Sequence, residues 1–385
     1  QLFNQVQSPR HVLSELLQNA DDVGATEASV CIEDGALIFM HNGEDFTEEH
    51  FASLCRFAYS NKRDLHTIGF RGIGFKSTFS VGDNVELYTP SLSVVFNRKR
   101  FTEPIWINKR NIVDARTRVR VVISDQHRQH EIEKNLQEWL KSPISLLFFR
   151  HIRHLQVGEH DLFWQSCGLG PVAGTEMMAL QENPERLFLV ARSDNELFPE
   201  ECLTEIMQER LIRPEQDMEF PPCKVEIVLG AKGHLYVVLP TSVETALPFA
   251  CNAPFIQDPA RLKIKDPETS PTNRWLLERI GSLSASVMLQ WLAHTDEIVS
   301  KKSHAYGLLP NVDRKDNTME GMCAATVEMS FSAAIEGKAF LLTDAGALKA
   351  PGQSVVIPET LIDIWPVEQA SVLFDEAGRP ALSRY

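Results

Sequence analysis

The sequence predicts an α+β fold in which a mixed sheet lies under helices. Three observations lead to this class: an amphipathic helix comes first, a hairpin follows it, and the other strands come only after a second helix and a glycine-rich segment. This order differs from the regular strand–helix alternation that is typical of parallel α/β sheets. The 385 residues suffice for two or three domains of roughly 100–200 residues each.

The first predicted helix covers residues 10–22, where apolar side chains recur at helical spacing from Leu13 to Ala20. Asp34 and Gly35 then separate two apolar runs, and an Asp-Gly pair between such runs is a hairpin turn signal. We therefore expect two antiparallel strands directly after the first helix.

The second predicted helix covers residues 47–58, with Thr47 as its N-cap and two acidic residues in its first turn. A polar stretch and a glycine segment follow it. The next predicted strands lie at 84–90, 92–98 and 116–124. A helix at 130–142 and an apolar run at 144–149 then close the first part of the chain.

The chain is predicted to consist of three parts, residues 1–155, 156–300 and 301–385. The second part carries predicted strands at 224–230 and 234–240, a long helical pattern at 273–294, and an acid-rich segment at 181–220 that we expect to be solvated. The third part is expected to hold loops and short strands. Because the chain begins with Gln and ends without an evident tail, we expect it to continue into a longer protein.

Composition restricts the class of protein. The net charge of −14 argues against a surface that grips nucleic acid as a whole. The seven cysteines form no C-x-x-C pair, which suits a reducing cytoplasm and gives no zinc signature. No apolar run approaches the ~20 residues that a membrane helix needs. We therefore expect a cytoplasmic protein without a membrane segment.

Glu15, Asn19 and Asp22 are spaced so that they share one face of the first predicted helix. An amide oxygen at this place can ligate magnesium, which prefers oxygen ligands. A carboxylate one turn away can polarise a water for attack on a phosphate. The alternative for these three residues is a solvated helix face.

The segment GFRGIGFKS, residues 69–77, matches the spacing of neither a P-loop nor a dinucleotide fingerprint. Its glycines would let backbone N–H groups approach an anion. Residues 75–81 could begin a helix whose N-terminus faces that anion. The alternative is a mobile loop.

Taken together, these motifs resemble those of the GHKL ATPase superfamily. Glu15 and Asn19 match its E-x-x-x-N helix, and the glycine segment matches its third motif in spacing and in its phenylalanine and serine. The Asn-Ala-Asp-Asp run that ends the helix is most similar to the sacsin-type branch. The resemblance covers residues 10–125 and implies a Bergerat-fold two-layer α/β sandwich, followed by a transducer-like α/β domain.

Two further motifs of the superfamily have partial counterparts. Ser60 and Lys62 look like the S-x-K of the mobile lid, and Thr117 fits the threonine of a Gly-Thr element, although Arg116 replaces the glycine. In the D-x-G motif, whose Asp accepts a hydrogen bond from adenine, His41 stands at the position of that Asp. Because an imidazole can offer a donor or an acceptor, adenine selectivity is less certain than nucleotide binding.

The resemblance implies ATP and Mg²⁺ as cofactors, with Asn19 as the metal ligand and Glu15 as the base that activates water. By the same resemblance Arg261, or failing it Lys263 or Lys265, is the candidate γ-phosphate sensor; the alternative is a basic surface loop. The implied cofactor-binding residues are Asn19, Asp22, His41, Asn42, Gly43, Ser60, Lys62, Gly69, Phe70, Arg71, Gly72, Ile73, Gly74, Phe75, Lys76 and Thr117.

The leading functional hypothesis is slow, Mg-dependent ATP hydrolysis that drives lid and domain closure, as the switch of a larger sacsin-like protein with chaperone-like remodelling. One alternative is a clamp or licensing module of a DNA-handling or bacterial defence system, and another is a nucleotide sensor with little hydrolysis. Expected partners are nucleotide, a protein client or further domains, and a second copy in a nucleotide-dependent homodimer. Residues 98–120 hold eight basic residues against two acids, which favours a solvated sheet face; the alternatives are a contact with nucleic acid or with an acidic partner.

Overall fold

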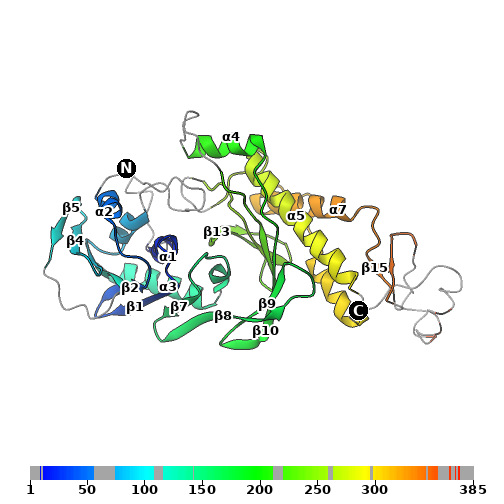
Figure 1. Ribbon diagram of the computed structural model, residues 1–385, viewed down its shortest axis with the longest axis horizontal. Helices are drawn as coiled ribbons and strands as arrows, with labels where there is room; N and C mark the ends of the chain where they lie inside the picture. The colour runs from blue at the N-terminus through cyan, green and yellow to red at the C-terminus, as the bar shows by residue number, and fades with distance from the viewer. Residues whose placement is uncertain are drawn as a thin grey trace. The chain divides into compact units, whose positions relative to one another are not determined.

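The computed structural model has a mixed α/β architecture, with helices and a large mixed sheet (Figure 1). It describes residues 9, 12–55, 74–107, 116–141, 143–210, 220–258, 263–294, 298–343, 346–353, 364, 365, 369 and 372. Two compact units are present. Unit 1 comprises Gln1–Gln165, Ala179–Arg186 and Ile206–Pro221, and unit 2 comprises Ser166–Met178, Leu187–Glu205 and Pro222–Tyr385. The three predicted ranges stay a prediction.

The sheet of unit 1 has the strand order β8-β7-β1-β2-β6-β3-β4-β5. Its strands are β1 (Glu27–Glu33), β2 (Ala36–His41), β3 (Asn84–Tyr88), β4 (Ser93–Asn97), β5 (Arg100–Trp106), β6 (Thr117–Val122), β7 (His154–Val157) and β8 (His160–Leu169). β1 pairs with β7 in parallel, whereas the other neighbouring strands pair antiparallel. The predicted mixed sheet is therefore present, with β5, β7 and β8 in addition to the predicted strands.

The turn between β1 and β2 is the predicted hairpin. Asp34 and Gly35 both have positive φ angles, 49° and 69°. A two-residue turn with positive φ at both positions matches the twist of the flanking strands, and Asp-Gly is a preferred pair for it. The turn sets the register in which Glu33 faces Ala36.

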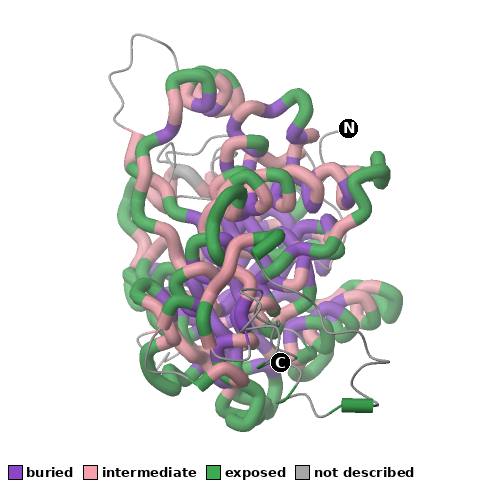
Figure 2. The backbone as a smooth tube through the Cα atoms, turned by 90° about the vertical axis from the view of Figure 1, so that its right-hand side faces the viewer, coloured by how far each residue is buried: buried purple, intermediate pink, exposed green. Residues whose placement is uncertain are grey.

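One face of this sheet is apolar across four strands. Val30, Phe39, Val119 and Leu87 face one another in register, and each is at most 4% exposed. Helix α1 (Val12–Asp22) buries its predicted leucine stripe and contacts β1. Figure 2 shows the buried residues in purple in the interior of the fold.

The remaining helices of unit 1 follow the sequence less closely. In α2 (Glu48–Leu54) the hydroxyl of Thr47 accepts a hydrogen bond from the backbone N–H of His50 at 3.1 Å, which confirms the predicted cap. Residues after the glycine segment form the 3₁₀-helix η3 (Gly74–Ser80). The predicted helix at 130–142 is α3 (Gln126–Lys141), and most of the apolar run after it belongs to the 3₁₀-helix η4 (Pro143–Leu147).

Unit 2 contains the strand order β13-β12-β14-β11-β10. Its further elements, some shared with unit 1, are β9 (Thr175–Leu180), β10 (Asn183–Arg192), α4 (Glu200–Glu209), β11 (Glu226–Leu229), β12 (His234–Val237), β13 (Leu239–Glu244), β14 (Phe249–Asn252), α5 (Pro271–Leu292), α6 (Val299–Lys302), η5 (Ser303–Leu308), α7 (Met319–Ile335), β15 (Leu341–Leu342) and β16 (Leu348–Lys349). The long helix predicted at 273–294 is confirmed by α5.

Three predictions for this region need correction. The segment expected to be solvated at 181–220 is exposed at residues 181–187, but it also contains β10 and α4, whose apolar residues such as Val190 and Ile206 are buried. The strand expected at 234–240 is two strands, which meet at Val238 with a φ of 60°. The third part holds α7 as well as short strands, and α7 packs on α5.

The contact between α5 and α7 requires a glycine. A Cβ atom built at Gly281 would collide with the backbone carbonyl of Val327. The two helices therefore approach closely at this point. Among the described residues, no helix combines the length and the apolar character that crossing a bilayer requires.

Candidate functional site

Helix α1 carries the first candidate residues beside the end of the glycine segment. Glu15 and Asn19 lie one turn apart on α1, both are half-buried, and both interact with neighbouring groups. The helix packs against η3, which begins at Gly74, the last glycine of the segment. The structure thus brings together two motifs that are separated by more than fifty residues in the chain.

The end of α1 contains a residue that sequence reasoning missed. The carboxylate of Asp21 accepts hydrogen bonds from the backbone N–H groups of Arg150, His151 and Ile152 at 3.1, 2.7 and 3.0 Å. Asp21 is 4% exposed. Its neighbour Asp22, the predicted site residue, is half-buried. The Asp-Asp sequence gives no local signal of this division of roles, because the partners of Asp21 are about 130 residues away.

A second group of candidate residues lies at the end of β2. His41 faces Thr117 of β6 on the apolar face of the sheet, and the two residues are 7% and 2% exposed. The Oγ1 atom of Thr117 has no hydrogen-bond partner in the part of the chain that the structure describes. Buried polar atoms are nearly always hydrogen-bonded. The Thr117 hydroxyl is therefore buried beside His41 and unpaired among the described residues.

The imidazole of His41 is neutral and has a defined tautomer. The backbone N–H of Gly43 donates to Nδ1 of His41 at 3.1 Å, so Nδ1 is an acceptor and the ring proton lies on Nε2. Burial lowers the pKa of His41 from 6.5 to about 4, because the charged form loses its hydration. Near neutral pH, Nε2 of His41 is therefore a hydrogen-bond donor.

Gly43 makes this arrangement possible by its lack of a side chain. A Cβ at Gly43 would lie 2.8 Å from Cγ2 of Val23 and 3.1 Å from Nδ1 of His41. The backbone N–H of Glu44 also donates to the carbonyl of Val23 at 2.9 Å. The segment after β2 is thus held tightly against the residue that follows α1.

The side chain of Asn42 anchors the same segment to the start of β1. The amide oxygen of Asn42 accepts from the backbone N–H groups of Thr26 and Glu27 at 2.9 and 3.0 Å. Nδ2 of Asn42 donates to Oγ1 of Thr26 at 2.8 Å. In this structure Asn42, a predicted cofactor-binding residue, therefore joins the segment to the start of β1.

Asp45 joins the segment to the turn between β3 and β4. Burial raises the pKa of the Asp45 carboxyl, but hydrogen bonds from Thr89, Phe46 and Ser91 outweigh it and hold the pKa below its usual range. The Phe46 backbone N–H donates at 2.7 Å. These anchors fix the backbone that positions His41.

Only the last part of the glycine motif falls in the described residues. Lys76 is 8% exposed; burial lowers its pKa, while the nearby Cys55 raises it. The ring of Phe75 meets that of Phe96 edge-on, with centroids 5.5 Å apart. The other predicted residues of the lid and the glycine segment lie outside the described residues: Ser60, Lys62, Gly69, Phe70, Arg71, Gly72 and Ile73.

Arg261 also lies outside the described residues, between two flanks that are described. Asp258 donates its backbone N–H to the carbonyl of Lys263 at 2.9 Å, and Lys265 donates to the carbonyl of Ile256 at 2.8 Å. This short ladder belongs to unit 2. Lys263 and Lys265, the alternative sensor residues, lie within 4 Å of Glu320 and Glu205 respectively.

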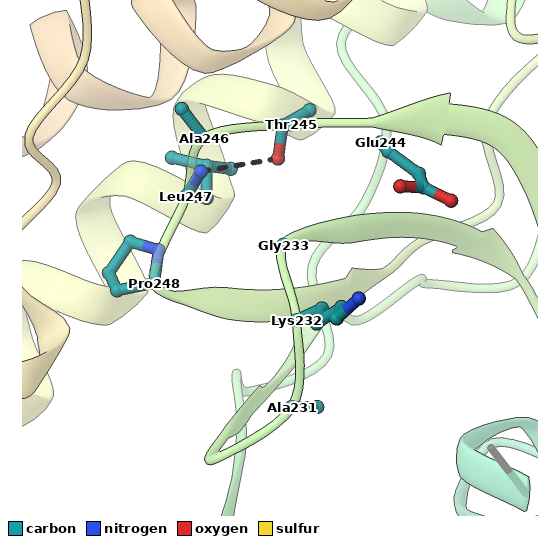
Figure 3. A pocket seen from close by; sticks show the side chains of 8 residues that line it. All are labelled: Ala231, Lys232, Gly233, Glu244, Thr245, Ala246, Leu247 and Pro248. Carbon is teal, nitrogen blue, oxygen red and sulfur yellow. Dashed lines mark hydrogen bonds between the residues drawn. The ribbon is translucent and has the colours of Figure 1, made fainter. Parts of the chain in front are cut away.

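A shallow pocket in unit 2 contains none of the predicted site residues (Figure 3). It lies between the residues before β12 and those that join β13 to β14, where the Leu247 backbone N–H donates to Oγ1 of Thr245 at 3.4 Å. Its lining residues are Ala231, Lys232, Gly233, Glu244, Thr245, Ala246, Leu247 and Pro248. Lys232 and Glu244 offer one charge of each sign, which selects no particular ligand.

No protein-family model matches this chain. An alignment over 87 residues, which covers 20% of the chain, is 41% identical to the DNA mismatch repair protein MutL of Chlorobium chlorochromatii (strain CaD3) and covers 13% of that protein. An alignment over 95 residues, which covers 22% of the chain, is 41% identical to the DNA mismatch repair protein MutL of Chloroherpeton thalassium (strain ATCC 35110 / GB-78) and covers 14% of it.

The match thus spans about one seventh of the length of these curated relatives. Mismatch-repair ATPases belong to the GHKL superfamily, so the similarity supports a GHKL-type ATPase module in part of the chain. It does not extend to the sacsin-type branch, which stays a prediction.

Proposed function

We propose that unit 1 binds Mg-ATP or a related nucleotide and hydrolyses it slowly, as a GHKL module with a Bergerat fold. The observation that carries this proposal is the packing of α1, with Glu15 and Asn19, on η3, which begins at Gly74. The similarity to MutL supports the same class of module.

The side chains on α1 suit the proposed chemistry. The amide oxygen of Asn19 is a hard ligand of the kind that Mg²⁺ accepts while it keeps several waters. The carboxylate of Glu15, one turn earlier, would orient and deprotonate the attacking water. The backbone N–H groups of Gly69, Gly72 and Gly74 would bind phosphate oxygens, and Lys62 would offset their charge.

Hydrolysis would be coupled to a change between parts of the chain through Arg261. If this residue contacts the γ-phosphate, one ligand contacts both the nucleotide domain (1–155) and the transducer-like domain (156–300), so binding favours one arrangement of the two. Residues 301–385 would extend the second domain. We propose chaperone-like remodelling by a larger cytoplasmic, sacsin-like protein as the outcome.

A second candidate function is a switch in a DNA-handling system. The observation that favours it is that both relatives are DNA mismatch repair proteins. In that case nucleotide would control a clamp, and two copies would associate when nucleotide binds. Because phosphate contacts release counterions, DNA binding would weaken steeply as salt rises. The absence of any salt-sensitive DNA binding by the chain would count against this candidate.

Calorimetry with ATP, ADP and GTP, each with and without Mg²⁺, tests the main proposal, followed by assay of phosphate release. We expect at least one triphosphate to bind in a Mg²⁺-dependent way and to be hydrolysed. Asn19→Ala should remove the Mg²⁺ dependence, whereas Asn97→Ala, which changes an amide on β4, should retain it. A chain that is folded but binds no nucleotide would overturn the proposal; binding without hydrolysis would favour a nucleotide sensor.

A further inference from the structure

We propose that His41 reads the nucleotide base as a hydrogen-bond donor, so that the site prefers 6-oxopurines, guanine or hypoxanthine, over adenine. This inference rests on the proposed function, because it concerns the base that the same site accepts. It names a specificity-determining residue and the class of nucleotide that the residue selects.

The direction of the hydrogen bond at His41 is set by the backbone. The Gly43 N–H donates to Nδ1 at 3.1 Å, so the ring must accept there and carry its proton on Nε2. A reversed tautomer would place two N–H groups against each other. An aspartate at this position could only accept, so the substitution of His for Asp reverses what the site offers to a base.

The protein holds this arrangement in place. The Glu44 N–H donates to the carbonyl of Val23 at 2.9 Å, and Asn42 is bonded to both Thr26 and Glu27. His41 itself is 7% exposed and contacts Phe39, with ring centroids 6.0 Å apart. A ring that is packed and bonded in this way cannot turn to present an acceptor without giving up the Gly43 bond.

Thr117 supplies the second half of the recognition. It faces His41 across the β2–β6 pair, is 2% exposed, and its hydroxyl has no partner among the described residues. A hydroxyl can donate or accept, so Thr117 adapts to either purine, whereas His41 cannot. The donor from His41 therefore decides the preference.

Adenine and the 6-oxopurines differ in the hydrogen-bond donors and acceptors that they carry at positions 6 and 1. A 6-oxopurine carries an acceptor, O6, beside the N1–H donor, so O6 can accept from His41 Nε2–H while N1–H donates to Thr117 Oγ1. Adenine carries the N6 amino donor beside the N1 acceptor, so its amino group would meet another donor. Burying two donors against each other leaves both unsatisfied, which lowers affinity by roughly tenfold or more.

The test compares the affinities of the chain for ATP, ITP and GTP by calorimetry at neutral pH with Mg²⁺. ITP is the most informative, because it differs from ATP only at positions 6 and 1 of the base. We expect ITP and GTP to bind roughly tenfold or more tighter than ATP. Equal or tighter binding of ATP would overturn the inference. No binding of any triphosphate would instead overturn the proposed function.

Two variants sharpen this result. His41→Asp should invert the order to favour ATP, because a carboxylate accepts from the adenine amino group. Thr117→Val should weaken both ITP and ATP without inverting their order. If His41→Asp does not fold, the ¹⁵N chemical shifts of the wild-type imidazole remain decisive: protonation at Nε2 supports the inference, and protonation at Nδ1 overturns it.

Discussion

The two units satisfy their buried polar side chains to different degrees. In unit 2, Asn273 is fully buried and its amide is saturated: the oxygen accepts from the Ile256 N–H at 2.7 Å, and the nitrogen donates to the carbonyls of Ile256 and Lys265 at 2.9 Å. In unit 1, the buried hydroxyl of Thr117 bonds to no described residue. The Asn273 amide therefore stabilises the fold of unit 2 through three hydrogen bonds, whereas the Thr117 hydroxyl contributes none among the described residues.

The difference extends beyond this pair. In the part of the chain that the structure describes, six buried side-chain nitrogen or oxygen atoms have no hydrogen-bond partner. All but one of them, the Nδ1 of His294, belong to unit 1. Since unpaired buried polar atoms destabilise a fold, unit 1 carries most of this destabilising contribution among the described residues. Thr117 is the member that faces another candidate site residue.

The largest expected change in stability tests whether a fully hydrogen-bonded side chain of unit 1 also stabilises the fold. Asp21→Ala leaves three backbone N–H groups without their buried carboxylate. We expect the free energy of unfolding to fall by about 3–5 kcal/mol, measured by urea denaturation. Asp22→Ala, one residue along, should cost clearly less. Equal losses for the two variants would contradict the distinction.

The next effect concerns pH and the buried imidazole. The pKa of His41 is about 4 in the folded chain and 6.5 when unfolded. The unfolded state therefore binds the proton first, so stability is full above pH 6.5 and falls as the pH drops toward 4. The shift corresponds to about 3 kcal/mol. His41→Gln should lack this component; a variant with the wild-type pH profile of stability would argue against a buried neutral ring.

The smallest expected change in stability comes from a pair of buried threonines, one in each unit. Thr241 of unit 2 is buried like Thr117, but its Oγ1 donates to the Leu235 carbonyl at 2.8 Å and accepts from the Val243 N–H at 3.2 Å. Thr241→Val should cost about 1–3 kcal/mol, and Thr117→Val should change stability by less than about 0.5 kcal/mol. Thermal or urea unfolding measures both. Similar losses at the two positions would show that Thr117 has a partner in the free protein.

Much of the fold could be predicted from local signals. The Asp34-Gly35 turn was found because its two positive φ angles need particular residues, and the Thr47 cap was found by its hydroxyl. The helix α7 was missed because its small residues, such as Cys323 and Ala324, show little helical periodicity. It packs on α5 where Gly281 lets the two helices approach closely, and no local pattern reveals this contact.

The candidate site also has features that local signals predict and features that they do not. Spacing alone places Glu15 and Asn19 on one helix face, and the structure adds that this helix packs on η3. The roles of Asp21 and of the His41 Nδ1 atom were not predictable. The first depends on partners about 130 residues away, and the second depends on the backbone geometry at Gly43.

Single-turnover phosphate release with Mg-nucleotide tests the central claim, that α1 forms the catalytic edge of a GHKL-type site. Glu15→Gln should reduce the rate by at least roughly a hundredfold while nucleotide affinity is retained. Glu131→Gln, which changes a half-buried acid on α3 of the same unit, should keep the wild-type rate. Unchanged turnover in Glu15→Gln, with the nucleotide still bound, would contradict the claim.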